Sequence, residues 1–156
     1  MEYRIREAAL TPALLDTLIR LSRDWEAEDI CYGYRANTAA DIEGNRVFLA
    51  EEEGRTLGYL FGHVEKARQS SSIMPDGTPC FEVEELYVVP DFRSRGLGGA
   101  LFRFAEDAAR GEAEYMMVST ATKNWRAILH FYLEELDMRF WSARLFKKLD
   151  GEGKEA

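Results

Sequence analysis

One stretch, residues 81–111, combines a strand pattern, a glycine-rich loop and a helix pattern. Residues 81–89 are rich in aromatic and β-branched side chains and stop at Pro90, which predicts a strand. Strict alternation along this strand would place Phe81 and Tyr87 on the same face. Residues 101–109 carry apolar side chains at helical spacing and end at Gly111, a usual helix C-cap residue.

The loop between the predicted strand and helix carries two arginines and three glycines: Arg93, Arg95, Gly96, Gly98 and Gly99. Backbone N–H groups of such a loop can turn inward at the positive end of the helix, beside two fixed cations. The stretch therefore predicts a phosphate-binding site. A glycine-rich turn with surface arginines is the alternative for so short a motif.

Spacing excludes two common phosphate loops. A dinucleotide fingerprint would require glycine at position 101, which is leucine, and a nucleoside-triphosphate loop would require Gly-Lys-Ser/Thr, which is absent.

Length, composition and charge limit which classes of protein and partner are compatible with this chain. With 156 residues, of which 46% are hydrophobic, the chain suits one domain, which we place at residues 1–150 before a charged tail at 151–156. No segment approaches membrane-spanning length, so we expect a soluble, cytoplasmic protein with no membrane partner. The separated Cys31 and Cys80 indicate neither a disulfide nor a metal site. A net charge of −8 argues against nucleic acid and weakly favours a cationic amine.

Patterns along the chain predict a mixed order of elements. Strands are expected at 3–8, 46–51, 56–64, 81–89, 115–120 and 140–149, with helices from Thr11-Pro12, from Thr38 to Gly44, over 101–111 and from Asn124. The order β-α-α-β-β-β-α-β-α-β is that of an α+β protein.

Val89-Pro90-x-x-Arg93-x-x-Gly96-x-Gly98, between a strand and a helix, strongly resembles the acetyl-CoA pyrophosphate loop of the GNAT N-acetyltransferase superfamily. The predicted element order also matches the GNAT fold over nearly the whole chain. This resemblance implies a mixed, mostly antiparallel central sheet flanked by helices, and an acetyl-CoA-dependent N-acetyltransferase. It further implies a bulge in the central strand that frees backbone groups near Val88. The cofactor-binding residues expected on this strand and loop are Leu86, Tyr87, Val88, Arg93, Ser94, Arg95, Gly96, Leu97, Gly98 and Gly99.

Acyl transfer to an amine needs a proton acceptor for the nucleophile. Three acids, Glu82, Glu84 and Glu85, lie within the predicted strand, against β propensity. A solvated strand face is an equally good explanation for any one of them. Aligned on the glycine loop, Glu84 falls where diamine and spermidine N-acetyltransferases of the family carry a carboxylate, so Glu84 ranks first and Glu85 second.

The departing thiolate needs a proton donor. Asn124-x-x-Ala127-x-x-x-Phe131-Tyr132 resembles the family's second cofactor-contacting helix, in which the tyrosine donates a proton and the asparagine contacts the cofactor. The resemblance thus implies Tyr132 as the acid and Asn124 and Phe131 as cofactor-binding residues. By periodicity alone, Tyr132 would be a core aromatic. Leu136-Asp137-Met138 stands where the family often has a Gly-Phe turn, which puts the last loop and any dimer contacts there in doubt.

The acceptor amine is expected near the end of the first helix, where acids and aromatics alternate. Trp25, Glu26, Glu28 and Tyr32 would suit a small cationic amine through charge pairing and cation–π contacts. A solvated acidic helix end is the competing interpretation. Transfer to a protein N-terminus or lysine, and a catalytically silent acyl-CoA-binding module, also remain open, as does the length of the acyl group. A homodimer is expected only by family habit.

Overall fold

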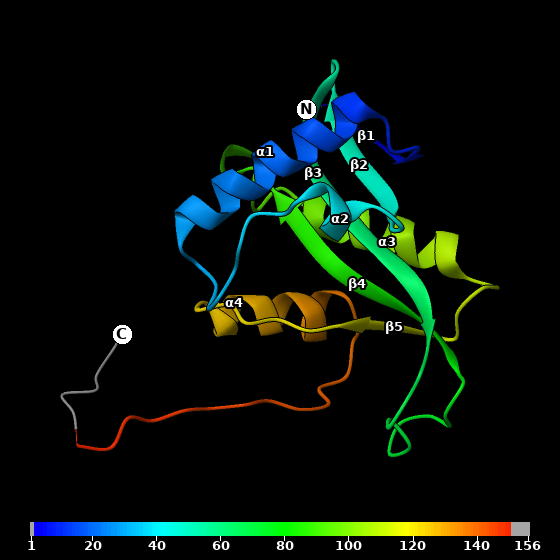
Figure 1. Ribbon diagram of the computed structural model, residues 1–156, viewed down its shortest axis with the longest axis vertical. Coiled ribbons are helices and arrows are strands. Elements are labelled where there is room, and N and C mark those ends of the chain that lie inside the picture. Colours follow the sequence, from blue (N-terminus) through cyan, green and yellow to red (C-terminus); the bar gives the residue numbers. More distant parts are fainter. Residues whose placement is uncertain (1, 151–156) are drawn as a thin grey trace.

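The computed structural model describes residues 2–150, so the predicted tail at 151–156 lies outside the described residues. Five strands form one sheet in the order β1-β2-β3-β4-β5, with β1–β4 antiparallel and β5 parallel to β4 (Figure 1). Their bounds are β1 Arg4–Ala8, β2 Arg46–Glu52, β3 Arg55–Lys66, β4 Pro79–Val88 and β5 Tyr115–Val118. The mixed, mostly antiparallel sheet expected from the sequence is therefore confirmed.

Helices cover both faces of this sheet. α1 (Pro12–Glu28) and α2 (Ala39–Ile42) bury Leu18, Leu21 and Ile42 in a core on one face. α3 (Leu97–Ala109) buries Leu101 and Phe102 in a second core on the other. The remaining helical elements are the 3₁₀ turn η1 (Pro90–Phe92), α4 (Trp125–Leu129) and the π-helix η2 (His130–Glu135). No helix within residues 2–150 is long and apolar enough to cross a bilayer.

Local signals place the first helix as predicted. The Thr11 hydroxyl accepts a hydrogen bond from the Leu14 N–H (3.1 Å), and Pro12 occupies the first helical position, where no N–H partner is needed. The helix ends at Asp29, which adopts a left-handed conformation with φ +52°. The chain then turns back across the sheet toward α2.

A β-bulge interrupts β4. Phe61 of β3 pairs with Glu85 whereas the next residue, Gly62, pairs with Val83, so Glu84 is an extra residue in β4. The bulge shifts the alternation: Phe81 lies in the core under α3, but Tyr87 lies in the core under α1. The expectation that these two side chains share a face is wrong for this reason. The family resemblance implied a bulge in this strand that frees backbone groups near Val88, and the observed bulge lies four residues before Val88.

Strands β4 and β5 separate partway along their length. Their pairing ends at Val83 and Val118, although β4 continues to Val88. Residues 84–88 consequently have no strand partner on that side within the described chain. We call the gap between residues 84–88 and residues 119–123 the β4–β5 opening.

Two predicted elements in the second half of the chain differ from the structure. α3 starts at Leu97, four residues before the predicted run, because the glycine loop itself supplies the first helical turn. Residues 140–149 form no strand: with Arg139 and Asp150 they make an extended segment, the C-terminal arm, which runs clear of the sheet (Figure 1). The predicted last strand is thus wrong, since these residues have no neighbouring strand to pair with.

Candidate active site

The glycine loop leads into α3 at the mouth of the β4–β5 opening. Gly96 is the N-cap of α3 with φ +85°, and no side chain caps the helix. The first N–H groups of a helix have no intrahelical partner, so those of α3 remain available to an anion. A methyl group on Gly98 would lie 3.4 Å from Cζ of Phe131 and 3.8 Å from Cγ2 of Val88. The loop, the end of β4 and η2 therefore meet at one place.

The two arginines of the loop have different surroundings. Arg93 donates from Nε to the Val88 carbonyl (2.9 Å) and pairs with Glu28 of α1 through both terminal nitrogens (2.5 and 2.9 Å). Burial alone would raise the pKa of Glu28, but hydrogen bonds from Arg93 and Tyr87 outweigh it and hold that pKa below its usual value. Arg95 is exposed and stacks over the Phe92 ring at 5.1 Å. The loop cation left free for a phosphate is Arg95, whereas Arg93 ties the loop to α1.

Glu85 is the centre of a partly buried polar cluster on the α1 side of the sheet. Its Oε1 accepts hydrogen bonds from Tyr59 (2.8 Å), Asn37 (2.9 Å) and Tyr34 (3.1 Å). Burial raises the pKa of Glu85 although these three donors lower it. Its second oxygen, Oε2, makes no hydrogen bond within the described residues. A carboxylate held in this way has one free oxygen and an elevated proton affinity.

Glu84, the adjacent bulge residue, lies outside this cluster. Its side chain is 45% exposed, and Oε1 is 3.7 Å from Nδ1 of His63. The two glutamates that the sequence ranked as candidate bases thus occupy different environments: Glu85 is partly buried among three donors, and Glu84 is exposed.

Tyr132 is on η2, on the α3 side of the sheet. Its ring packs edge-on against Phe102, with centroids 6.2 Å apart. Burial raises the pKa of Tyr132 to about 12, so the hydroxyl keeps its proton at neutral pH. Asn124 is exposed immediately before α4, and its side chain does not cap that helix. The helix start predicted at Asn124 is confirmed, but not the capping bond.

A family model described as the acetyltransferase (GNAT) family matches residues 12–138. The chain belongs to the GNAT acetyltransferase family. An N-alpha-acetyltransferase of Sulfurisphaera tokodaii is 24% identical over 92% of this chain and 94% of its own length. A putative acetyltransferase structure from Pyrococcus furiosus superposes with a TM-score of 0.69 at 16% identity, covering 95% of this chain and all of that one. The aminoglycoside N-acetyltransferase AAC(6')-Iy in complex with CoA superposes with a TM-score of 0.65 at 18% identity, over 95% and 100% of the two chains.

Membership makes this protein an acetyl-CoA-dependent N-acetyltransferase, with acetyl-CoA as the acetyl donor. The geometry fits that donor, because the opening, the uncapped N-terminus of α3 and Arg95 lie together. These matches show the GNAT family, but they give no specific support for the diamine and spermidine N-acetyltransferase subtype.

In this GNAT acetyltransferase, two of the four predicted acceptor residues, Trp25 and Glu28, lie on the same side of the sheet as Glu85. Trp25 stacks on Tyr34 (ring centroids 4.2 Å apart) and Tyr87 (5.2 Å), and its buried Nε1 has no hydrogen-bond partner among the described residues. Glu28 accepts a hydrogen bond from the Tyr87 hydroxyl (2.9 Å). We call Trp25, Glu28, Tyr34, Tyr59, Glu85 and Tyr87 the acidic–aromatic cluster.

The other two predicted acceptor residues lie elsewhere. Glu26 accepts a hydrogen bond from the Ala36 N–H (2.8 Å) and so fixes the loop after α1. Tyr32 is 49% exposed, beneath Nζ of Lys123 (5.4 Å from the ring centroid). Sequence reasoning also missed Asn37 and Tyr59, since neither carries a local signal and both reach Glu85 only through the tertiary fold.

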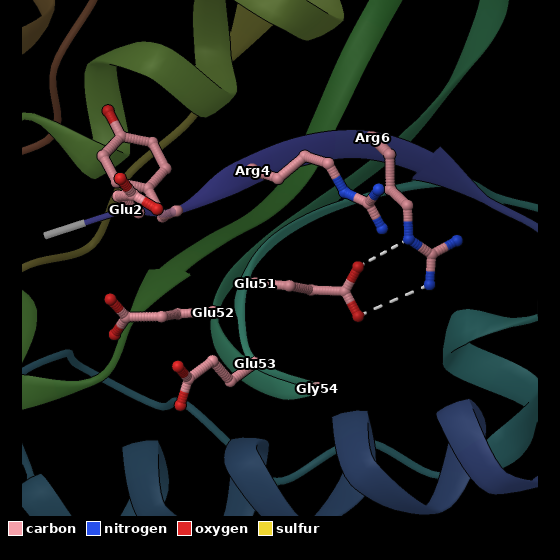
Figure 2. A pocket seen from close by; sticks show the side chains of 8 residues that line it. Glu2, Arg4, Arg6, Glu51, Glu52, Glu53 and Gly54 are labelled. Atoms are coloured by element: carbon pink, nitrogen blue, oxygen red, sulfur yellow. Dashed lines mark hydrogen bonds and ion pairs between the residues drawn. The ribbon is translucent and has the colours of Figure 1, made fainter.

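A hollow of about 680 Å³ lies at the opposite edge of the sheet, between β1 and the β2–β3 turn (Figure 2). Arg4, Arg6 and Glu51 are among its lining residues, and Arg6 is paired with Glu51 (2.5 Å). None of the predicted site residues lines it. The hollow therefore has no part in the candidate active site.

Proposed function

We propose that this GNAT acetyltransferase transfers an acetyl group from acetyl-CoA to the primary amine of a small cationic molecule, by direct attack in a ternary complex. The observation that carries this proposal is the acidic–aromatic cluster, in which Glu85 keeps one oxygen free beside stacked aromatic rings. Aromatic faces and a carboxylate recognise a cation together. One solved relative of the same fold is an aminoglycoside acetyltransferase, which is consistent with a cationic acceptor.

Acetyl-CoA would be held at the β4–β5 opening. Backbone groups of Leu86, Tyr87 and Val88 border the opening, and the N–H groups of Leu97, Gly98 and Gly99 point from the first turn of α3. Arg95 would supply a cation for phosphate, while Asn124 and Phe131 would contact the cofactor from the helix that follows β5. Acetyl-CoA supplies an acetyl group activated as a thioester. Arg93 and Ser94 would shape the loop, because Arg93 is bound to Glu28 and Ser94 adopts φ +61°.

Two side chains would manage the protons. Free Oε2 and the raised pKa favour Glu85 over Glu84 as the acceptor of the amine proton. Tyr132, protonated at neutral pH, would donate its hydroxyl proton to the departing sulfur. Both carboxylates remain candidates for the first role, and their glutamine variants separate them.

A second acceptor class has support of its own. The relative that matches nearly the full length of this chain is named an N-alpha-acetyltransferase, which favours a peptide N-terminus as the alternative acceptor. The unpartnered Trp25 N–H would suit a peptide carbonyl near the reacting amine.

The test is a thiol-release assay of acetyl-CoA with diamines, spermidine, an aminoglycoside, amino acids and N-terminal peptides. We expect kcat/KM for the cationic small amines to exceed that for the peptides, and to fall as salt rises, since screening weakens charge recognition. Turnover with peptides alone would establish the alternative. Binding of acetyl-CoA by calorimetry without turnover of any acceptor would instead indicate a silent binding module.

A further inference from the structure

Glu28, the last residue of α1, has both carboxylate oxygens occupied. Its Oε1 accepts a hydrogen bond from Nη1 of Arg93 (2.5 Å), and its Oε2 accepts from Nη2 of Arg93 (2.9 Å) and from the Tyr87 hydroxyl (2.9 Å). A cationic amine would bind Glu28 only by displacing one of these donors. The sequence placed Glu28 among the acceptor residues, but its contacts connect it with the cofactor loop.

The position of Glu28 in α1 is explained by a partner outside the helix. A carboxylate in the last turn lies at the negative end of the helix dipole, which disfavours it. The last turn of α1 contains no basic residue that could compensate. The Glu28 side chain is only 21% exposed, so its charge is also partly removed from water. Compensation comes from Arg93, through a bidentate, charge-assisted pair.

Arg93 in turn is the anchor of the cofactor loop. Its Nε donates to the Val88 carbonyl (2.9 Å), and its guanidinium lies over the Tyr87 ring, 5.3 Å from the centroid. The next two residues, Ser94 and Arg95, make no hydrogen bond to any residue within 2–150. Ser94 also adopts φ +61°, a left-handed conformation that is unfavourable for a non-glycine residue and persists only where the surroundings enforce it. The Arg93 side chain therefore fixes the direction in which the loop enters α3.

We propose that Glu28 is a positioning residue of the donor site: through Arg93 it holds the cofactor loop so that the first N–H groups of α3 can receive the pyrophosphate of acetyl-CoA. This assignment rests on the proposed location of acetyl-CoA at the β4–β5 opening, and it does not depend on the class of acceptor. Arg93 contributes to donor binding as an anchor, and Arg95 remains the loop cation available to phosphate.

The sign of the effect distinguishes positioning from simple electrostatics. Glu28→Gln removes a negative charge near the site of an anionic cofactor, so Coulomb attraction alone predicts tighter binding of acetyl-CoA. Positioning predicts the opposite, because a neutral amide cannot hold Arg93 in a charge-assisted pair. We expect the dissociation constant of acetyl-CoA, measured by calorimetry, to rise about tenfold in Glu28→Gln.

Asp24→Asn is the matched control for charge. Asp24 lies one turn before Glu28 on α1, is exposed, and makes no hydrogen bond or ion pair with the described residues. The substitution removes the same charge without disturbing Arg93, and an exposed charge is screened, so acetyl-CoA affinity should change by less than about twofold. Equal weakening by the two variants, or tighter binding in Glu28→Gln, would overturn the proposal.

A double-mutant cycle tests whether Glu28 and Arg93 act as one unit. Arg93→Met and Glu28→Gln should each weaken acetyl-CoA binding, and the double variant should bind no more weakly than the poorer single variant. Arg93→Lys keeps the positive charge but lacks the planar fork that spans both oxygens of Glu28, so it should not restore parent affinity. Additive losses, or parent affinity in Arg93→Lys, would contradict the assignment.

Inorganic pyrophosphate separates positioning of the loop from a general loss of stability. In amide NMR spectra of the parent, pyrophosphate should shift the signals of Leu97, Gly98 and Gly99, and Glu28→Gln should need about tenfold more of it for the same shift. Gly96→Glu is the reference for the location of the cofactor. If it leaves acetyl-CoA binding unchanged, that location is wrong and the assignment of Glu28 fails with it. If it abolishes binding while Glu28→Gln has no effect, only the assignment of Glu28 is wrong.

Discussion

Replacing Glu85 with glutamine separates the charge of this side chain from its shape. All three hydrogen bonds from Tyr34, Asn37 and Tyr59 go to Oε1, and a glutamine oxygen can take the same place. The variant should therefore fold with its cluster intact while losing the charge and the capacity to accept a proton.

The stability effect follows from the raised pKa of Glu85. The folded chain binds this proton more tightly than the unfolded chain, whose glutamates titrate at about 4.3. The contribution is thus fully present below the unfolded pKa and is lost as pH rises through the folded pKa. Each unit by which folding raises the pKa corresponds to about 1.4 kcal/mol, a loss that the glutamine variant does not suffer.

Urea denaturation of parent and Glu85→Gln from pH 5 to 8.5 measures this effect, because titration of other groups cancels in the difference. We expect the unfolding free energy of the variant to increase relative to that of the parent as pH rises. The difference should become constant above the folded pKa of Glu85. A difference in unfolding free energy that does not change with pH, or that changes in favour of the parent as pH rises, would refute the claim that burial dominates the pKa of Glu85.

Activity provides the second half of the test. If Glu85 accepts the amine proton, Glu85→Gln should lower kcat/KM about 10²–10⁴-fold while acetyl-CoA affinity stays unchanged. Glu84→Gln is the matched control, one residue away and in solvent, and should keep most of the activity. The reverse pattern would assign the role to Glu84, as the alignment first ranked it.

Three further changes test other parts of the site. Tyr132→Phe should lower kcat about 10²-fold or more without weakening CoA binding in calorimetry; unchanged turnover would return Tyr132 to a purely structural role. Gly96→Glu, at φ +85° and before the uncapped helix, should abolish acetyl-CoA binding, and binding that persists would contradict the phosphate cradle. Gly62→Ala places a methyl group against the Glu82 carbonyl and 2.8 Å from the Phe81 ring, so thermal unfolding should report about 1–3 kcal/mol of destabilisation. Because Gly62 has no positive φ, this loss should measure the steric clash and not left-handed backbone strain.

Much of the fold could be predicted because its signals are local. Thr11 and Pro12 start α1 through their own hydroxyl and ring, and Glu53 and Gly54 form the β2–β3 turn with positive φ. The glycine loop was predicted for the same reason, since Gly96 needs its left-handed conformation whatever surrounds it. The bulge at Glu84 has no comparable signal, because one inserted residue leaves the apolar composition of β4 unchanged.

The acceptor side of the site could be predicted only in part. Trp25 and Glu28 lie at helical spacing near the end of α1, so the sequence grouped them correctly. Their partners come from β3, β4 and the loop before α2, and no periodicity connects Tyr59 or Asn37 to Glu85. Such a cluster is specified by tertiary packing, which turns separate polar residues into one buried network.

The arm shows a different limit of sequence reasoning. Alternation and aromatic content say that residues 140–149 can pair as a strand, but a strand is defined by its partner. Leu136-Asp137-Met138 stands where the family often has a Gly-Phe turn; Asp137 adopts φ +56° there, and residues 140–149 pair with no strand within the described chain. Alternation at residues 140–149 therefore specified a capacity to pair but not a partner, and the prediction of a strand failed at that step.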